Sequence, residues 1–134
     1  MVRTKNQIRG SKSKGAQMEY SVADSLRPIF PDILVTKQLG FVSQYDLVSK
    51  DSMIVIECKK HKGFSWNELM KYFIKLEEVA PEKYKAFVIF KSNHQPCLVM
   101  YRHKISREIV VSLFYDVFEL DFIKHVGKKK VITE

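Results

Sequence analysis

The chain has 134 residues, of which 46% are hydrophobic, and its formal net charge is +8. This length and apolar content fit one compact domain with a hydrophobic core. The sequence contains neither a run of 18 apolar residues nor a charged start followed by an apolar centre, so we expect no transmembrane helix, signal peptide or membrane partner. The two cysteines, Cys58 and Cys97, lack metal-site spacing and are expected to be reduced thiols of a cytoplasmic, nucleoid-associated protein.

The positive charge is concentrated at the two ends of the chain. Nine of the 23 basic residues lie in residues 1–14 and 124–134, where the only acid is Glu134. Residues 15–123 hold 14 basic and 14 acidic residues, so the centre is neutral. Basic ends either keep a protein soluble or contact a polyanion, and a bias at both ends favours a polyanion such as nucleic acid.

The first predicted element is a helix that carries an acid on its apolar side. Ser11 or Ser13 could cap its start, and it ends at Arg27 because Pro28 follows. Glu19 falls at helical spacing with the apolar positions of this segment. We therefore expect Glu19 to face the core.

Apolar runs rich in β-branched and aromatic residues predict strands through most of the remaining chain. The order of helices and strands predicts an α/β domain with a central mixed sheet flanked by helices. We expect a flexible basic arm over residues 1–10, one domain over residues 11–125 and a basic tail over residues 126–134. The predicted strands are residues 33–35, 45–49, 53–59, 84–91, 97–102 and 109–113.

Two more helices are predicted after the strand at 53–59. Ser65 stands three residues before Glu68 in a capping-box pattern, and Pro81 marks the far end of this helix. A final helix should start at Asp116, which has Glu119 three positions later. The apolar stripe of the helix capped by Ser65 is predicted to contain Trp66, Leu69 or Met70, Phe73 and Leu76.

Two acids and a lysine are predicted to meet at one end of the sheet. In the strand at 53–59, alternation puts Glu57 and Lys59 on one face and Cys58 on the other. Asp46 starts the neighbouring strand of a hairpin that turns at residues 50–52. Singly, each has an ordinary explanation, such as an edge salt bridge or a turn residue. Their combination with a buried helical Glu19 favours a functional site.

Carboxylate and carbonyl oxygens are the ligands that Mg²⁺ prefers, and one or two protein carboxylates suffice to bind it. Asp46 and Glu57 could supply carboxylates, the backbone carbonyl of Cys58 another ligand, and Glu19 could reach the ion directly or through water. Lys59 could orient or deprotonate a water molecule, or neutralise charge on a phosphodiester. We therefore expect Mg²⁺ as the cofactor, with Mn²⁺ as a possible substitute.

The order helix-Glu, Asp, Glu-x-Lys resembles the PD-(D/E)XK nuclease superfamily, and specifically its archaeal-type Holliday junction resolvases. The resemblance covers roughly residues 9–102. It implies a restriction-endonuclease-like fold, with Glu19, Asp46 and Glu57 as metal-site acids and Lys59 as the catalytic lysine. It is carried by Arg9-Gly10-Ser11-Lys12-Ser13-Lys14-Gly15-Ala16-Gln17-Met18-Glu19, residues 40–46, Ile54-Val55-Ile56-Glu57-Cys58-Lys59-Lys60, residues 66–80 and residues 86–90.

The resemblance implies a homodimeric, metal-dependent endodeoxyribonuclease that resolves four-way DNA junctions by paired symmetric nicks, in DNA recombination and repair. The resemblance also implies that Ser43, three residues before Asp46, could match a loop serine that these enzymes place near the scissile phosphate. Two alternatives stay open: a nuclease of the same type acting on a flap, mismatch or restriction site, and a DNA-binding module that no longer cuts. The candidate DNA-binding residues are Arg3, Lys5, Arg9, Lys12, Lys14, Ser43, Lys60, Lys62, Lys71 and Lys75.

The apolar residues near the end of the chain are candidates for the dimer interface. They could equally belong to the protein's own core. These residues are Phe114, Val117, Phe118, Leu120 and Phe122.

Overall fold

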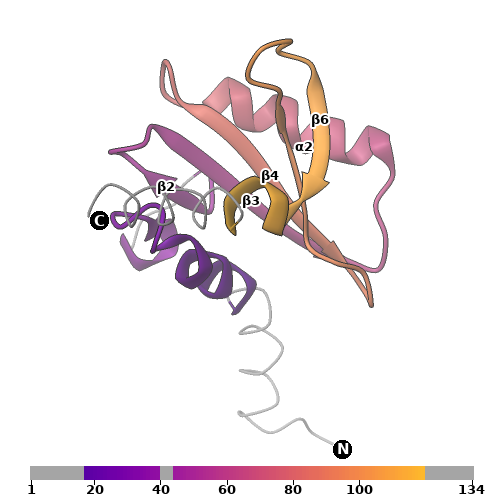
Figure 1. The fold of residues 1–134 in the computed structure, drawn as a ribbon, viewed down its shortest axis with the longest axis horizontal. Coiled ribbons are helices and arrows are strands. Elements are labelled where there is room, and N and C mark those ends of the chain that lie inside the picture. The colour runs from indigo at the N-terminus through magenta and orange to yellow at the C-terminus, as the bar shows by residue number, and fades with distance from the viewer. Residues whose placement is uncertain (1–16, 40–43, 120–134) are drawn as a thin grey trace, which may run out of the picture.

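Six strands form one mixed sheet in the computed structural model, which describes residues 17–39 and 44–119 (Figure 1). The strands lie in chain order across the sheet, and all neighbours are antiparallel except β3 and β4. This confirms the predicted α/β class with a mixed sheet. The strands are β1 (Leu34–Val35), β2 (Leu47–Ser49), β3 (Ile54–His61), β4 (Lys85–Ser92), β5 (Leu98–Arg102) and β6 (Ile109–Leu113).

The hairpin of β2 and β3 forms as predicted, with Leu47 opposite Ile56 and Ser49 opposite Ile54. Asp32 fixes its turn from outside, because one carboxylate oxygen accepts from the Ser49 hydroxyl at 2.6 Å and the other from the Asp51 amide at 2.9 Å. This turn sets the register that brings Asp46 beside β3.

Helix α2 (Trp66–Val79) connects β3 to β4. A crossover of this kind is required because β3 and β4 are parallel. The predicted cap is present: the Ser65 hydroxyl accepts a hydrogen bond from the Glu68 amide at 3.2 Å. The predicted inclusion of Trp66 in the buried stripe is wrong, since this first helical residue is 53% exposed. The buried residues of α2 are Leu69, Phe73 and Leu76.

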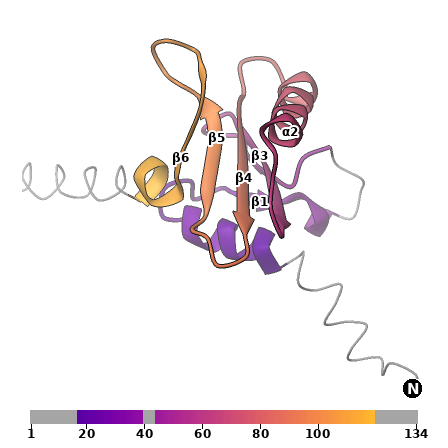
Figure 2. The ribbon, with the colours of Figure 1, turned by 90° about the vertical axis from the view of Figure 1, so that its right-hand side faces the viewer.

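The sheet is covered on both faces, which gives two hydrophobic cores. Helix α2 packs on one face through Phe73, against Val55 and Val88 of the central strands. The helix over residues 17–26 packs on the other face, against Ile54 and Ile56 of β3 among others. Figure 2 shows α2 and this N-terminal helix at different sides of the strands. Alternate residues of β3 therefore point to opposite layers, which decides where its polar residues lie.

The N-terminal helix ends as the proline predicted. Residues 17–26 are helical, and the carbonyl of Leu26 accepts from the amides of Ile29 and Phe30 in the turn that follows. Its predicted start at Ser11 or Ser13 lies outside the described residues. Within residues 17–39 and 44–119, none of the helices has the length and apolar character that crossing a membrane requires.

The chain continues from β6 into η2 (Tyr115–Glu119), a single turn of π-helix at the position of the predicted last helix. Phe114 and Phe118 are buried in the core beneath the N-terminal helix, and Val117 packs against it. The expectation that Phe114 and Phe118 form a dimer interface is therefore wrong, because the protein's own core covers them. The other interface candidates, Leu120 and Phe122, the arm over residues 1–10 and the tail over residues 126–134 lie outside the described residues.

Candidate functional site

Asp46 is fixed at the start of β2 through its backbone and its side chain. Its amide donates to the carbonyl of Ile56 at 3.0 Å, and its carbonyl accepts from the amide of Thr36 at 2.9 Å. Its Oδ2 accepts a hydrogen bond from the amide of Cys58 at 2.8 Å. The carboxylate therefore lies against β3, at the level of its two charged residues.

Glu57 and Lys59 share the face of β3 that α2 covers, as alternation predicted. Val55 belongs to the core on that face, whereas Cys58 packs in the core on the other face. The Lys59 ammonium lies 3.4 Å from the Glu57 carboxylate, and the two side chains are 29% and 19% exposed. The pair is thus half-buried and still open to a ligand from solvent.

Two carboxylates crowd together at this point of the sheet. Burial raises the pKa of Glu57, the negative charge of Asp46 and a hydrogen bond between the two side chains raise it further, and Lys59 opposes them. The resulting pKa of Glu57 is about 7. Two acids in this position favour either a shared proton or a bound cation.

The ammonium of Lys59 is held by an aromatic ring as well as by Glu57. It lies 4.6 Å from the ring centroid of Tyr72 on α2, within the range of a cation–π interaction. Sequence reasoning missed Tyr72. The signal was present, because Tyr72, Lys75, Leu76 and Val79 recur at helical spacing along one side of α2.

Glu19 is buried, as its helical position predicted, with 6% of its surface exposed. One carboxylate oxygen forms an ion pair with Lys37 at 3.0 Å, a partner that the sequence pattern did not reveal. The other oxygen, Oε2, is buried and has no hydrogen-bond partner among the described residues. Burial raises the pKa of Glu19, the Lys37 hydrogen bond opposes that rise, and the charge of Asp46 adds to it.

Glu19 approaches the acids from the Cys58 side of the sheet. Burial raises the pKa of the Cys58 thiol well above its usual range, and the charges of Asp46, Glu19 and Glu57 raise it further. Such a thiol stays protonated at neutral pH, so its side chain contributes packing and not a nucleophile. The charge of Asp46 also raises the pKa of both Glu19 and Glu57, so Asp46 links the acids on the two faces of β3.

A cavity of about 560 Å³ opens over Asp46, Glu57 and Lys59. Lys71 and Lys75 of α2 form part of its wall, together with Gln44 from the segment before Asp46. The acids at the floor and the lysines at the rim give this cavity the charge pattern that a cation and a phosphate group would each match. The exposed lysines Lys60 and Lys62 follow Lys59 along and beyond the end of β3.

The residues present fit a hard divalent cation. Two adjacent carboxylates, the nearby backbone of Cys58 and the unpartnered Oε2 of Glu19 supply only oxygen ligands, which Mg²⁺ and Mn²⁺ accept. In the part of the chain that the structure describes, no three side chains of His, Cys, Asp or Glu are grouped so that one ion could take all three. This arrangement favours Asp46 and Glu57 as direct ligands and contact with Glu19 through water.

The structure thus brings together Asp46, Glu57 and Lys59, with Glu19 behind them and two predicted DNA-binding lysines, Lys71 and Lys75, beside them. The other predicted DNA-binding residues on the N-terminal side lie outside the described residues. These are Arg3, Lys5, Arg9, Lys12, Lys14 and Ser43.

A comparison with protein-family models found no match, and searches of curated proteins and of solved structures likewise found none.

Proposed function

We propose that this protein is a divalent-metal-dependent endodeoxyribonuclease of the PD-(D/E)XK type that resolves four-way DNA junctions. The observation that carries the proposal is the meeting of Asp46, Glu57 and Lys59 on one face of the sheet, in an open cavity with a basic rim. Holding Glu57 partly buried beside the charge of Asp46, which raises the pKa of Glu57, is costly unless the pair serves a ligand or a reaction.

In this proposal Asp46, Glu57 and the backbone carbonyl of Cys58 hold the cation, and Glu19 contacts it through water. Mg²⁺ or Mn²⁺ supplies Lewis-acid stabilisation of charge on the phosphodiester and makes water more acidic. The amide of Cys58 aims the Asp46 carboxylate, and the hairpin fixes its distance from Glu57.

Lys59 places a positive charge at the reacting phosphate. Glu57 and the ring of Tyr72 hold its ammonium from two sides, so it is oriented before a substrate arrives. It either orients the attacking water or neutralises charge that develops on the phosphate oxygens. Lys71 and Lys75 extend the positive surface along α2 and position the DNA backbone.

The four-way junction is proposed from the sequence. Residues 9–102 resemble archaeal-type Holliday junction resolvases, and the basic ends of the chain suit phosphate contacts without base reading. The restriction-endonuclease-like topology of the sheet belongs to the same proposal.

Paired symmetric nicks require two active sites related by two-fold symmetry, so we propose a homodimer. With Phe114 and Phe118 in the core, the outer side of α2 offers an apolar surface instead. Trp66 and Ile74 are 53% and 40% exposed, and Met70 lies between them at helical spacing. These three residues are the surface that we propose for the dimer interface.

Cleavage of an end-labelled synthetic four-way junction, beside a linear duplex with the same arm sequences, tests the proposal. The reactions contain Mg²⁺, Mn²⁺ or EDTA. Symmetric metal-dependent nicks in the junction alone would support it. Equal cutting of both substrates would replace it with a nuclease for another DNA substrate, and binding without cutting would replace it with a DNA-binding module.

A further inference from the structure

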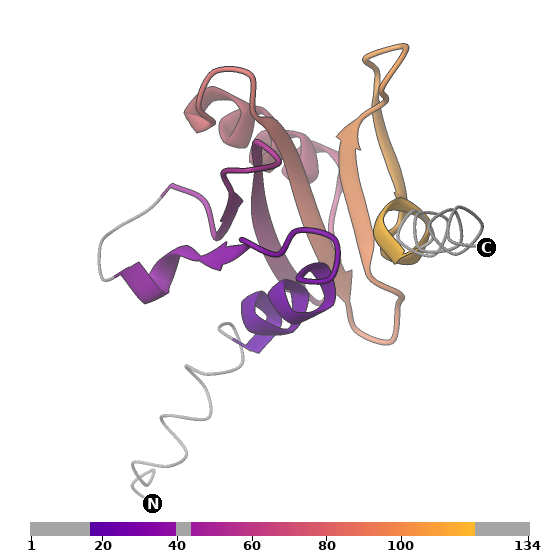
Figure 3. The same cartoon turned by 60° about the vertical axis from the view of Figure 1, so that its left-hand side comes forward.

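A second cavity, of about 380 Å³, opens where β4 and β5 stop pairing. The ladder between β4 and β5 starts at Val88 and Met100, whereas β4 remains paired with β3 back to Lys85. Both strands continue past the ladder and diverge, as Figures 1 and 3 show. We call the space between them the fork cavity. Three aromatic residues, Phe87, Tyr101 and Phe118, line its wall. Three basic residues, Lys85, Lys104 and Arg107, also line it.

The wall of the fork cavity is aromatic. The rings of Phe87 and Tyr101 are stacked with centroids 6.0 Å apart, and both side chains are half-buried. Phe118 closes the wall from η2, with its ring centroid 5.5 Å from that of Phe87. Flat, partly exposed aromatic faces of this kind suit a planar ring more than a flexible aliphatic chain.

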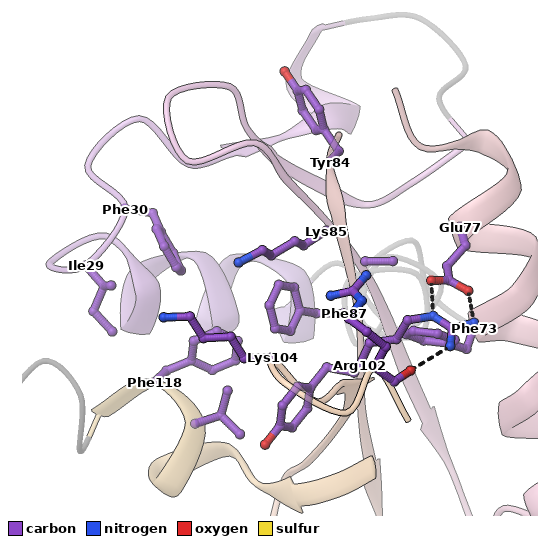
Figure 4. Close-up of a pocket in the computed structure, with 14 residues that line it drawn as sticks. Ile29, Phe30, Phe73, Glu77, Tyr84, Lys85, Phe87, Arg102, Lys104 and Phe118 are labelled. Atoms are coloured by element: carbon purple, nitrogen blue, oxygen red, sulfur yellow. Dashed lines mark hydrogen bonds and ion pairs between the residues drawn. The ribbon is translucent and has the colours of Figure 1, made fainter. Parts of the chain in front are cut away.

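The surroundings of the fork cavity are cationic. Figure 4 shows Lys85 and Lys104 extending over the aromatic residues. Among the described residues, neither these two lysines nor the side chain of Arg107 forms an ion pair. The one acid that lines the cavity, Glu77, is already engaged by Arg102 at 2.6 and 2.9 Å. An occupant must therefore carry negative charge to match the cavity.

The backbone holds Arg107 in place at this site. Arg107 has a φ of 64°, in the left-handed region that residues other than glycine seldom adopt. Its amide donates to the carbonyl of His103 at 3.0 Å, and its carbonyl accepts from Arg102 at 2.9 Å. The loop between β5 and β6 is thus fixed with Arg107 against the cavity.

We propose that the fork cavity binds an unpaired nucleotide of a DNA strand, with the base against Phe87 and Tyr101 and its phosphate at Lys85 and Lys104. Stacking on aromatic side chains beside a basic surface is how proteins hold unpaired bases. The identification of DNA as the source of the nucleotide rests on the proposed function. Helix α2 contributes Phe73 and Glu77 to this cavity and Tyr72 and Lys75 to the cavity over the acids. The two cavities therefore lie on two sides of one helix.

The test compares two duplexes in EDTA, one fully paired and one with a single unpaired 2-aminopurine. Affinity is measured by fluorescence anisotropy and base insertion by the 2-aminopurine signal. The wild-type protein should prefer the unpaired base by about tenfold. Phe87→Leu, and separately the double change Lys85→Gln with Lys104→Gln, should remove the preference. Lys91→Gln, at the opposite end of the same strand, is the matched control and should retain it.

Equal affinity for the two duplexes, or a preference that survives both variants, would overturn the inference. NMR titration with dAMP, monitored at Phe87 and Tyr101, separates the sources of the nucleotide. Saturable shifts with dAMP but none with the bulged duplex would overturn the assignment to DNA.

Because EDTA prevents cleavage, the preference for the unpaired base is measured without catalysis at Asp46 and Glu57. Binding of the unpaired base without any nuclease activity would refute only the proposed function, and cleavage without the preference would refute only this inference.

Discussion

The amide of Cys58 donates a hydrogen bond to the carboxylate of Asp46, and so ties the acid of β2 to the strand that carries Glu57. This bond engages Oδ2 of Asp46 and holds the carboxylate beside Glu57. The same hydrogen bond orients the Asp46 carboxylate and stabilises the hairpin. Substitutions of Asp46 must therefore distinguish a loss of metal binding from a loss of folding stability.

Asp46→Asn should abolish metal-dependent cleavage while keeping the fold. The amide oxygen of Asn can still accept from Cys58, but the negative charge on the cation is gone. We expect single-turnover cleavage of a four-way junction to fall by roughly two orders of magnitude or more, with junction binding in EDTA retained. Asp46→Ala also removes the hydrogen bond and should lower the free energy of unfolding by about 1–2 kcal/mol. Normal cutting by Asp46→Asn would show that the site has been assigned wrongly.

The metal-free protein should lose stability as the pH rises from about 4.5 to about 7. In this window folded Glu57 keeps a proton, since its pKa is raised to about 7, whereas the unfolded chain releases it. The folded state binds more protons, so the free energy of unfolding decreases with pH, by roughly 2–3 kcal/mol for this group. Glu57→Gln should remove that part of the slope in urea titrations. The exposed Glu82→Gln is the control, and an equal slope in wild type and Glu57→Gln would contradict the prediction.

Tyr72→Leu should slow cleavage more than Tyr72→Phe. Phenylalanine keeps a ring face under the Lys59 ammonium, which leucine does not. We expect Tyr72→Phe to cut within about threefold of wild type and Tyr72→Leu to lose about tenfold, with little change in junction affinity. If both variants cut equally, the ring does not position Lys59.

Deletion of residues 1–10 should weaken junction binding and reduce its dependence on salt. For every phosphate that the arm binds, its removal should lower the slope of log affinity against log salt by about one. Measurements with Lys71→Gln and Lys75→Gln at the same salt concentrations test the surface beside the acids in the same way. An unchanged slope after the deletion would mean that the arm binds no phosphate.

Replacement of Trp66 and Ile74 by serine should dissociate the proposed dimer without unfolding the chain. Trp66 and Ile74 are 53% and 40% exposed on α2 and lie outside the buried core, so the folded monomer should tolerate their replacement. Sedimentation velocity should change from dimer to monomer, while the melting temperature of the monomer stays near that of wild type. Leu113→Ser, another exposed apolar side chain on β6, serves as the control. A dimer that persists in the double variant would place the interface elsewhere.

Much of this architecture was predictable because its signals are local. The hairpin that carries Asp46 and Glu57 follows from two apolar runs and a polar turn, and α2 follows from Ser65 and Glu68. Alternation along β3 was enough to place Glu57 and Lys59 together.

What the sequence did not show depends on tertiary packing. Lys37 has no pattern that links it to Glu19, and their ion pair forms because η1 (Thr36–Leu39) lies beside the N-terminal helix. The burial of Phe118 and the exposure of Trp66 are decided by which helix covers which part of the sheet. Apolar character alone does not distinguish these two positions.

The two acids of the site lie in differently paired parts of the sheet, because Glu57 is within β3 and Asp46 directly precedes the short strand β2. β3 is paired with β4 over eight positions, whereas β1 and β2 share only two at the edge of the sheet. Short edge strands open more readily than the centre of a sheet, so hydrogen exchange should be faster around Asp46 than around Glu57. If opening at this edge extends to the three paired positions between β2 and β3, the carboxylates separate while the pairing of β3 with β4 persists. A ligand that bridges the two acids would therefore hold the short strand β2 against β3.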